Sequence, residues 1–384
     1  MIHPKDFYEM LGKNGVYAFF GVPDSLLKSF CAYIQDNVAK DRHIIAADEG
    51  GAVALASGHY LATGELGLVY MQNAGQGHAI NPLASLADKE VFGIPMILLI
   101  GWRGEIGEDG NQIHDEPQHV KQGKVTLKLL EAMDTPYDVL EPRMEVSEID
   151  RMVTNAVSVA KERKEPYALV VRKGVFEEYK LQSKAEEIYT MSREDAIKEI
   201  YGFLDEERDI VISPTGMASR ELFEHKAALG QDTEKSNFRS VGSMGHCPMI
   251  GMGIALAKPE RQVYVFEGDG GAIMHMGTFG IVASRGVKNY KQIVFNNGAH
   301  DSVGGQPTVG DKIDIAGIAK LSGYKAVFKA ETPDQLRESM KKLKEIDGPA
   351  MLEVFVKKGA RKDLGRPTKT PKENKEAIME NLRK

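Results

Sequence analysis

The sequence predicts an α/β protein made of two tandem domains, each with a parallel sheet flanked by helices. Three observations support this prediction. The chain of 384 residues is too long for one ordinary domain and short for three. Short apolar runs alternate with helix-like segments, as buried parallel strands do in α/β proteins. This alternation occurs in two series, which are separated by a stretch with little apolar periodicity.

The two series set the expected domain boundaries. Strand-like runs of the first series lie at residues 16–20, 44–47, 67–71, 96–100 and 168–171. Those of the second series lie at residues 210–213, 263–266, 292–295 and 351–356. Ser192 and Asp195 between the series are spaced like the start of a helix. We therefore predict a first α/β domain at 1–178, a linker at 179–191, a second α/β domain at 192–357 and a basic carboxyl-terminal tail at 358–384.

Composition narrows the classes of partner. The formal net charge of −6 argues against a nucleic acid held through its phosphates. No apolar run approaches membrane-spanning length, and charged residues stand where a signal peptide needs an apolar core. The two cysteines, Cys31 and Cys247, form no CxxC pair and support neither a disulfide framework nor a zinc site. We expect a soluble cytoplasmic protein with no nucleic-acid or membrane partner.

Two glycine-containing turns at strand ends carry the strongest signal for a site. Gly268-Asp269-Gly270-Gly271 follows the run at 263–266, and Asn296-Asn297-Gly298 follows the run at 292–295. Glycines after a strand let backbone N–H groups approach phosphate oxygens, and Asp and Asn supply the oxygen ligands that Mg²⁺ prefers. The two turns are far enough apart in the chain for one crossover helix between neighbouring parallel strands. Each turn alone is also explained by ordinary turn chemistry, but the pair favours a site for Mg²⁺ and a diphosphate.

This arrangement resembles the cofactor motif of thiamine-diphosphate enzymes. In that family the Asp, the second Asn and the backbone carbonyl two residues later hold the metal, which implies Asp269, Asn297 and Ala299 as Mg²⁺ ligands. A further loop, Gly242-Ser243-Met244, resembles the family segment whose apolar side chain bends the cofactor, although methionines are often plain core residues. The resemblance thus implies a cofactor-binding set of Gly242, Ser243, Met244, Gly268, Asp269, Gly270, Gly271 and Asn297.

The run at 44–47 leads into Asp48 and Glu49 and then a helix of small residues, which resembles the family segment that carries the activating glutamate. Glu49 would promote the imino form of the aminopyrimidine ring, so that the cofactor can lose its C2 proton. Helix capping by two acidic residues is the alternative explanation. In this family the cofactor lies between the pyrimidine-binding domain of one subunit and the diphosphate-binding domain of another. The resemblance therefore implies self-association, at least to a dimer.

The predicted linker leaves no room for the middle domain of full-length family members. The chain resembles instead the compact two-domain decarboxylases of 2-oxo acids that carry a phosphonate or a sulfonate, in segments 21–26, 101–105, 115–119, 215–221, 296–308 and 359–367. The implied reaction is decarboxylation of 3-phosphonopyruvate to phosphonoacetaldehyde and CO₂ through an ylide and an enamine. Three alternatives stay open: the sulfonate substrate, a carboligase reaction, and a non-catalytic diphosphate- or dinucleotide-binding protein, although no GxGxxG motif follows a first strand.

The phosphonate group directs attention to cationic and hydroxyl side chains. Arg361, Arg366, Ser25 and Ser302 are candidate ligands for it, and Asp24 would position the substrate. His119 and His300 would donate protons in later steps, because imidazole titrates near neutral pH. A solvated basic tail, turn serines and packing histidines are the alternative explanations for these residues.

Overall fold

The computed structural model describes residues 1–183 and 188–384. The chain divides between residues 184 and 185 into two compact units, which we call unit 1 (1–184) and unit 2 (185–384). The predicted linker, 179–191, spans this division, and its residues 184–187 lie outside the described part of the chain.

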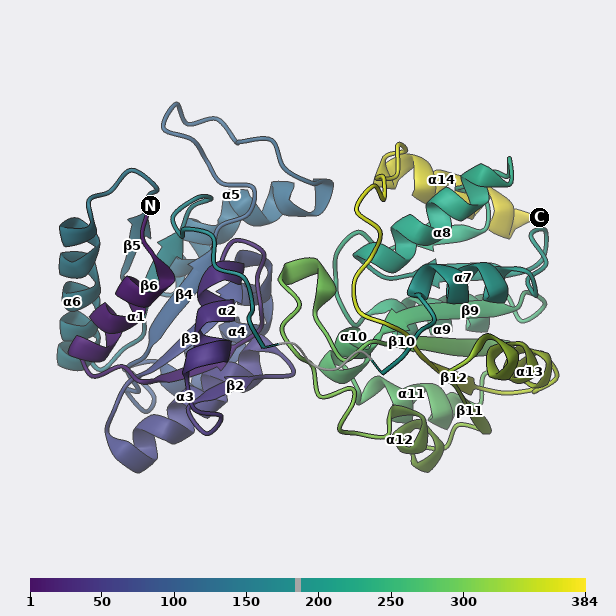
Figure 1. Cartoon of the computed structure of the whole chain (residues 1–384), viewed down its shortest axis with the longest axis horizontal. Helices are drawn as coiled ribbons and strands as arrows, with labels where there is room; N and C mark the ends of the chain where they lie inside the picture. Colours follow the sequence, from purple (N-terminus) through teal and green to yellow (C-terminus); the bar gives the residue numbers. More distant parts are fainter. Residues whose placement is uncertain (184–187) are drawn as a thin grey trace. The chain divides into compact units, whose positions relative to one another are not determined.

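Unit 1 contains a six-stranded parallel sheet with the strand order β2-β1-β3-β4-β6-β5 (Figure 1). Of its central strands, β1, β4 and β6 are buried along their whole length and β3 up to its last residue, as expected for strands covered on both faces. The strands are β1 (Ala18–Gly21), β2 (His43–Ile45), β3 (Gly67–Gln72), β4 (Ile97–Gly101), β5 (Tyr137–Leu140) and β6 (Tyr167–Val171).

Helices cover both faces of this sheet. One hydrophobic core joins the sheet to α1 (Pro4–Lys13), α2 (Lys28–Asn37) and α6 (Val146–Arg163). A second core on the other face contains residues of α3 (Glu49–Thr63), α4 (Gln76–Pro82) and α5 (Pro117–Ala132). Two short segments, η1 (Asn73–Gly75) and η2 (Leu83–Ala87), flank α4.

Unit 2 repeats this architecture with the strand order β11-β12-β10-β9-β7-β8, again all parallel. The strands are β7 (Ile210–Ser213), β8 (Asn237–Arg239), β9 (Val263–Gly268), β10 (Tyr290–Asn296), β11 (Ala326–Ala330) and β12 (Ala350–Phe355). The helices are α7 (Arg193–Tyr201), α8 (Met217–Ala228), α9 (Cys247–Ala257), α10 (Asp269–Met274), α11 (Thr278–Arg285), α12 (Ile315–Leu321), α13 (Pro333–Lys344) and α14 (Pro371–Arg383), with a short η3 (Asp301–Val303).

The predicted fold class is confirmed, because each unit is a parallel sheet between two layers of helices. Three strands were not predicted from the sequence: β5, β8 and β11. All three lie at sheet edges: β5 and β11 are partly exposed, and β8 has only three residues, of which Asn237 and Arg239 are polar although buried, so none shows the continuous apolar run that marks a central strand.

The segment predicted as a basic tail contains a helix that belongs to unit 2. In α14 the buried Asn374 accepts a hydrogen bond from the Arg239 backbone N–H at 3.0 Å and donates to the Asn237 carbonyl at 2.8 Å. Both partners lie on the edge strand β8. Because strand edges leave backbone groups unpaired, Asn374 satisfies two of them and fixes α14 to the sheet.

Candidate functional site

The end of β9 places an acidic side chain in the interior of unit 2. Strand β9 ends at Gly268 and α10 begins with Asp269, which is 2% exposed. The Thr308 hydroxyl donates a hydrogen bond to Asp269 Oδ2. A Cβ built on Gly310 would lie 2.5 Å from the same oxygen, so only glycine fits beside it. The carboxylate is thus held by a strand end and a closely packed loop.

Two asparagines with different contacts lie at the end of the neighbouring strand β10, where Asn296 is the last residue and Asn297 follows it. Asn296 donates to the Gly310 carbonyl at 2.7 Å and to Glu353 Oε1 at 2.8 Å, which ties the loop to β12. Asn297 donates from Nδ2 to Asp301 at 2.6 Å and accepts at Oδ1 from the Ala299 backbone N–H at 3.0 Å. In the parallel register Phe295 of β10 pairs with Gly268 of β9, so both strands end at the same edge.

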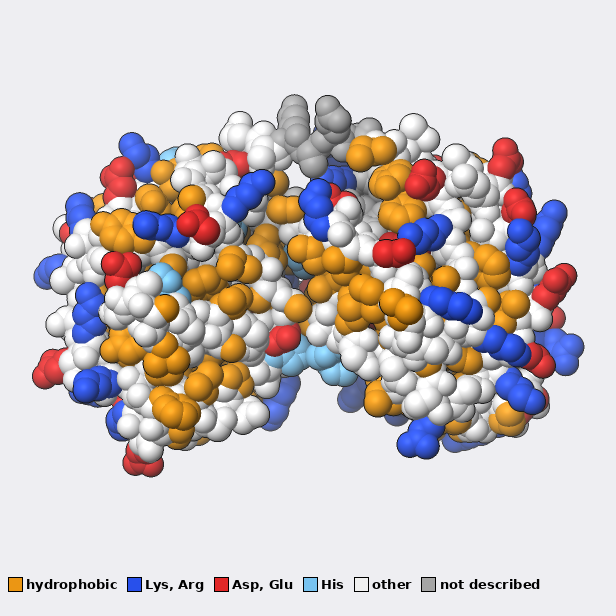
Figure 2. Space-filling model, turned by 90° about the horizontal axis from the view of Figure 1, so that it is seen from below, with side chains coloured by type: hydrophobic (Ala, Val, Ile, Leu, Met, Phe, Trp, Pro, Cys, Tyr) orange, Lys and Arg blue, Asp and Glu red, His pale blue; other side chains and the backbone are white. Residues whose placement is uncertain are grey.

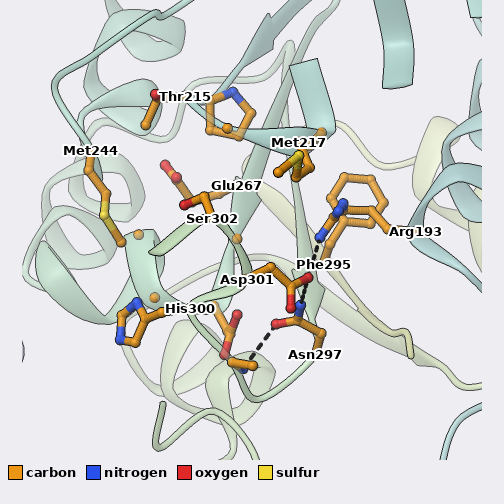
Figure 3. A pocket seen from close by; sticks show the side chains of 18 residues that line it. Arg193, Thr215, Met217, Met244, Glu267, Phe295, Asn297, His300, Asp301 and Ser302 are labelled. Atoms are coloured by element: carbon orange, nitrogen blue, oxygen red, sulfur yellow. Dashed lines mark hydrogen bonds and ion pairs between the residues drawn. The ribbon is translucent and has the colours of Figure 1, made fainter. Parts of the chain in front are cut away.

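A pocket at this edge brings most of the predicted residues of unit 2 together (Figure 3). Figure 3 shows Met244 and His300 on one side of the pocket and Arg193 on the other. Of the predicted residues, the pocket is lined by Met244, Gly268, Asp269, Gly270, Gly271, Asn297, Ala299, His300 and Ser302. Gly242 and Ser243 are not among the lining residues, and Ser243 is exposed with a positive φ of 53°.

Burial dominates the protonation behaviour of the pocket. It raises the pKa of Asp269 to about 6 and that of Glu267 to about 8, because charge is costly away from water. Burial lowers the pKa of His300 to about 4, so at neutral pH this imidazole is neutral. A bound cation would stabilise the charged carboxylates, since an ion's own charge dominates its surroundings.

The residues at the pocket fit Mg²⁺ and a diphosphate. Asp269, Asn297 and the Ala299 carbonyl offer hard oxygen donors of the kind that Mg²⁺ takes. A Cβ on Gly270 would lie 3.0 Å from His300 Cε1 and 3.2 Å from Met244 Cε, so glycine keeps this part of the pocket open. Among the described residues, no group of three or more His, Cys, Asp or Glu side chains forms a metal site of another kind.

In unit 1, Glu49 occupies the first turn of α3. The Asp48 side chain caps this helix by accepting from the Gly51 N–H at 2.8 Å, which leaves Glu49 for another contact. Glu49 is buried, and its Oε2 lies 2.6 Å from His78 Nδ1 of α4. The hydrogen bond from His78 to Glu49 raises the pKa of His78. Nothing in the sequence around His78 indicates this partner, so the contact was not predicted.

A polar cluster lies at the carboxyl edge of the unit 1 sheet. Asp24, which follows β1 and is fully buried, accepts from Gln72 Nε2 at 2.6 Å and from the Leu26 N–H at 2.9 Å. Burial raises the pKa of Asp24. Arg103, which follows β4, donates from Nη1 to the Ser25 hydroxyl at 2.9 Å. The structure therefore brings Asp24 and Ser25 together with the guanidinium of Arg103, for which no role was predicted from the sequence.

Arg103 and His119 extend this cluster. Arg103 forms a two-point ion pair with Asp115, with N···O distances of 2.7 Å and 2.5 Å. His119 in α5 is buried, and its Nδ1 has no hydrogen-bond partner. Burial and the Arg103 charge lower the pKa of His119 to about 4. His119 and His300 are thus both neutral at pH 7 and would have to gain a proton before donating one.

The two arginines predicted to bind a phosphonate do not line the pocket. Arg361 makes ion pairs with Glu194 at 3.1 Å, with Asp363 at 3.2 Å and with Glu224. The pairs with Glu194 of α7 and Glu224 of α8 hold the carboxyl-terminal segment against these two helices. Arg366 is exposed in the same segment.

Two family models, one for each unit, define the class of the protein as a thiamine-diphosphate enzyme. Residues 4–125 match the family described as "Thiamine pyrophosphate enzyme, N-terminal TPP binding domain", and residues 216–354 match "Thiamine pyrophosphate enzyme, C-terminal TPP binding domain". The two matches fall on unit 1 and unit 2 respectively.

The relatives narrow the class further. A phosphonopyruvate decarboxylase of Streptomyces viridochromogenes is 32% identical over 97% of this chain and 93% of its own. A sulfopyruvate decarboxylase of Methanosarcina acetivorans is 24% identical over 94% of this chain and 92% of its own. The beta subunit of the sulfopyruvate decarboxylase of Methanocaldococcus jannaschii is 33% identical over 43% of this chain and 82% of its own. The alpha subunit of the same enzyme is 33% identical over 34% of this chain and 70% of its own. The chain belongs to the phosphonopyruvate decarboxylase family of thiamine-diphosphate-dependent enzymes.

None of the helices in the described part of the chain combines the length and the apolar character needed to cross a bilayer.

The contact between His78 and Glu49 predicts a pH response. We expect the pKa of His78 to lie above its ordinary value of 6.5 and to fall in Glu49→Gln, because the variant removes the carboxylate that stabilises the imidazolium. The stabilisation from this pair is present below pH 6.5 and is lost as the pH rises through the raised pKa. NMR titration of the histidines in the wild type and in Glu49→Gln measures the pKa of His78. His43, whose pKa burial lowers to about 4, serves as the control and should not change.

Proposed function

We propose that this protein decarboxylates 3-phosphonopyruvate to phosphonoacetaldehyde and CO₂, with thiamine diphosphate and Mg²⁺ bound. The observation that carries the proposal is the pocket of unit 2, in which Asp269, Asn297 and Ala299 lie at the meeting edge of β9 and β10. The substrate class comes from the phosphonopyruvate decarboxylase of Streptomyces viridochromogenes, to which this protein is 32% identical over nearly its whole length.

In this proposal the strand ends of unit 2 hold the metal and the diphosphate. Asp269, the Asn297 side chain and the Ala299 carbonyl bind Mg²⁺, and the turn formed by Gly268, Gly270 and Gly271 lies beside the phosphate oxygens. Backbone N–H groups at the start of α10 favour an anion there. Met244 borders the same pocket and would support the bound cofactor from one side.

Bound thiamine diphosphate would supply the nucleophile for the substrate carbonyl and the sink for the electrons that CO₂ leaves behind. The chain contributes Glu49, whose buried carboxyl group would hold a proton against the aminopyrimidine ring. Buried surroundings also favour a reaction in which charge is lost, because charged ground states are poorly solvated there. His119 and His300 are candidates for the later proton transfers. Because both imidazoles are neutral at pH 7, each would first accept a proton and then donate it.

The cluster of unit 1 supports a place for the phosphonate. Ser25 and Arg103 present a hydroxyl and a guanidinium at the carboxyl edge of the sheet, next to Asp24. A guanidinium suits a phosphonate because it offers several N–H donors in one plane. Ser302 is the corresponding candidate in unit 2. Arg361 is a weaker candidate than Arg103, because three carboxylates already surround it.

Self-association is part of the proposal. Glu49 belongs to unit 1 and Asp269 to unit 2, and the resemblance to the family assigns such half-sites to different subunits. Large hydrophobic side chains are exposed on both units, such as Leu61 at 72% and Ile281 at 49%, and Figure 2 shows hydrophobic side chains over one face of each unit. The family relative that is divided into alpha and beta subunits also supports an assembly.

We also place the protein in the cytoplasm. Cys31 and Cys247 are both buried as free thiols, which suits a reducing compartment.

The proposed reaction predicts release of CO₂ and phosphonoacetaldehyde from 3-phosphonopyruvate, with a requirement for both thiamine diphosphate and Mg²⁺. Glu49→Gln should lower kcat by about 100-fold or more, because it removes the acid–base group, and should leave Mg²⁺-dependent cofactor binding largely intact. Product analysis measures turnover, and calorimetry measures cofactor binding. Preferred turnover of sulfopyruvate in a competition assay would reassign the substrate, and wild-type turnover in Glu49→Gln would remove that residue from the mechanism.

Active sites shared between subunits predict complementation between two inactive variants. Glu49→Gln has an intact unit 2 and Asn297→Ala an intact unit 1, so a mixed dimer contains one complete site. Coexpression of the two should therefore restore roughly a quarter of wild-type activity, given random pairing in a symmetric dimer. The separately expressed variants, mixed without subunit exchange, are the control. No recovery in isolated mixed assemblies would place both half-sites on one chain.

A phosphonate held by Arg103 predicts a change in KM. Arg103→Lys keeps the charge but loses the planar donors, so KM for 3-phosphonopyruvate should rise about tenfold or more, in line with the strength of a charge-assisted hydrogen bond. Steady-state kinetics measures the change, and thiamine diphosphate affinity should stay the same. Arg361→Lys is the matched control, with KM expected to stay near the wild-type value. The reverse pattern would assign the phosphonate to Arg361.

A further inference from the structure

We propose that Asp301 is a positioning residue that fixes the amide of Asn297 with its oxygen toward the metal site of unit 2. This inference rests on the proposed function, in which Asn297 Oδ1 is a ligand of Mg²⁺. Asp301 itself lines the same pocket and is the first residue of η3, four residues after Asn297.

An asparagine side chain can point either end of its amide group toward a metal site. An amide group has a donor end and an acceptor end of nearly the same shape, and only its oxygen binds a metal cation. Rotation by half a turn would therefore present Nδ2 to the metal and abolish the bond. Contacts with neighbouring groups must therefore fix the orientation of the Asn297 amide.

The hydrogen bonds of Asn297 fix the orientation of its amide. Its Nδ2 donates to Asp301 Oδ2 at 2.6 Å, and an ionised carboxylate can only accept. Its Oδ1 accepts from the Ala299 N–H at 3.0 Å, which leaves a second lone pair for another partner. A flipped amide would set its oxygen against the carboxylate and its NH₂ group against the Ala299 N–H. Both contacts would then be repulsive.

Asp301 is itself held by donors from distant parts of unit 2 (Figure 3). Arg193 Nη1 lies 3.2 Å from Asp301 Oδ2, and the Gly359 N–H donates to both oxygens at 3.1 Å. Arg193 is fixed in turn by Glu221, through N···O contacts of 2.8 Å and 3.1 Å. The Arg193–Glu221 pair is buried, so it provides a rigid support for Asp301.

The charges of this network favour a cation as well. Arg193 carries one positive charge, while Glu221 and Asp301 carry two negative charges, so the network has an excess negative charge beside the pocket. Asp269 adds a further carboxylate to the same pocket, from the end of the neighbouring strand β9. The segment at 359–367 contacts the pocket residue Asp301 through the Gly359 N–H. It therefore helps to hold Asp301 in place, which its sequence alone did not indicate.

The test compares the Mg²⁺ dependence of thiamine diphosphate binding in Asp301→Asn, Asp301→Ala and wild type, by calorimetry on the full-length protein. We expect the Mg²⁺ concentration at half-saturation to rise by about 10- to 100-fold in Asp301→Ala, as for other partners that orient metal ligands. Asp301→Asn keeps one acceptor oxygen and should show a smaller rise. Saturating Mg²⁺ should restore cofactor binding in both variants.

Asp363→Asn is the matched control, because it also loses an ion pair in the carboxyl-terminal segment but has no contact with Asn297. Melting temperatures without ligands separate a general loss of stability from a loss of Mg²⁺ affinity. Wild-type Mg²⁺ dependence in folded Asp301→Asn and Asp301→Ala would overturn the positioning role. The role would also be overturned if Asp363→Asn weakened Mg²⁺ binding equally.

Asn297→Ala distinguishes this inference from the proposed function. If Asn297→Ala binds Mg²⁺ and thiamine diphosphate as the wild type does, the metal site is elsewhere and both proposals are wrong. If Asn297→Ala loses Mg²⁺-dependent binding while the Asp301 variants keep it, the inference alone is wrong. Should Asp301→Ala fail to fold, Asp301→Asn decides the question with the same measurement.

Discussion

The parallel register of β9 and β10 is the constraint on which the pocket of unit 2 depends. Gly268 pairs with Phe295, so the residues that follow the two strands emerge together at one sheet edge. Both strands are buried along nearly their whole length, so a slip by one residue would exchange the side chains of the two covered faces and disrupt the packing on each. Asp269 and Asn297 therefore share a pocket although a helix pair separates them in the chain.

Burial gives this edge its chemical character. Carboxyl groups such as Asp269 and Glu267 have raised pKa values because they lie away from water, and His300 is neutral for the same reason. A site of this kind is poorly satisfied on its own and gains from a divalent cation that compensates the acidic side chains. In unit 1, the buried side chain of Glu49 has His78 within hydrogen-bonding distance.

Much of the fold was predictable from local patterns. The apolar runs at 263–266 and 292–295 lie within the central strands β9 and β10, because burial on both faces requires unbroken hydrophobic residues. The edge strands β5 and β11 lacked that signal because they are partly exposed and carry polar residues, and β8 lacked it because it is short and its polar residues Asn237 and Arg239 are buried. The helix α14 was missed as well, because its many charged residues resemble a solvated tail while only a few residues, Asn374 among them, attach it to β8.

The sequence by itself determined the fold class, the family and the residue types at the two strand ends, because these depend on local periodicity and on short motifs. Only the tertiary structure decided which side chains from distant segments meet. The pairing of Arg103 with Ser25, of His78 with Glu49, and of Arg193 and Gly359 with Asp301 joins residues far apart in the chain. The structure also showed that Arg361 is occupied by carboxylates. Such contacts follow from the packing of whole elements, and no pattern within one segment encodes them.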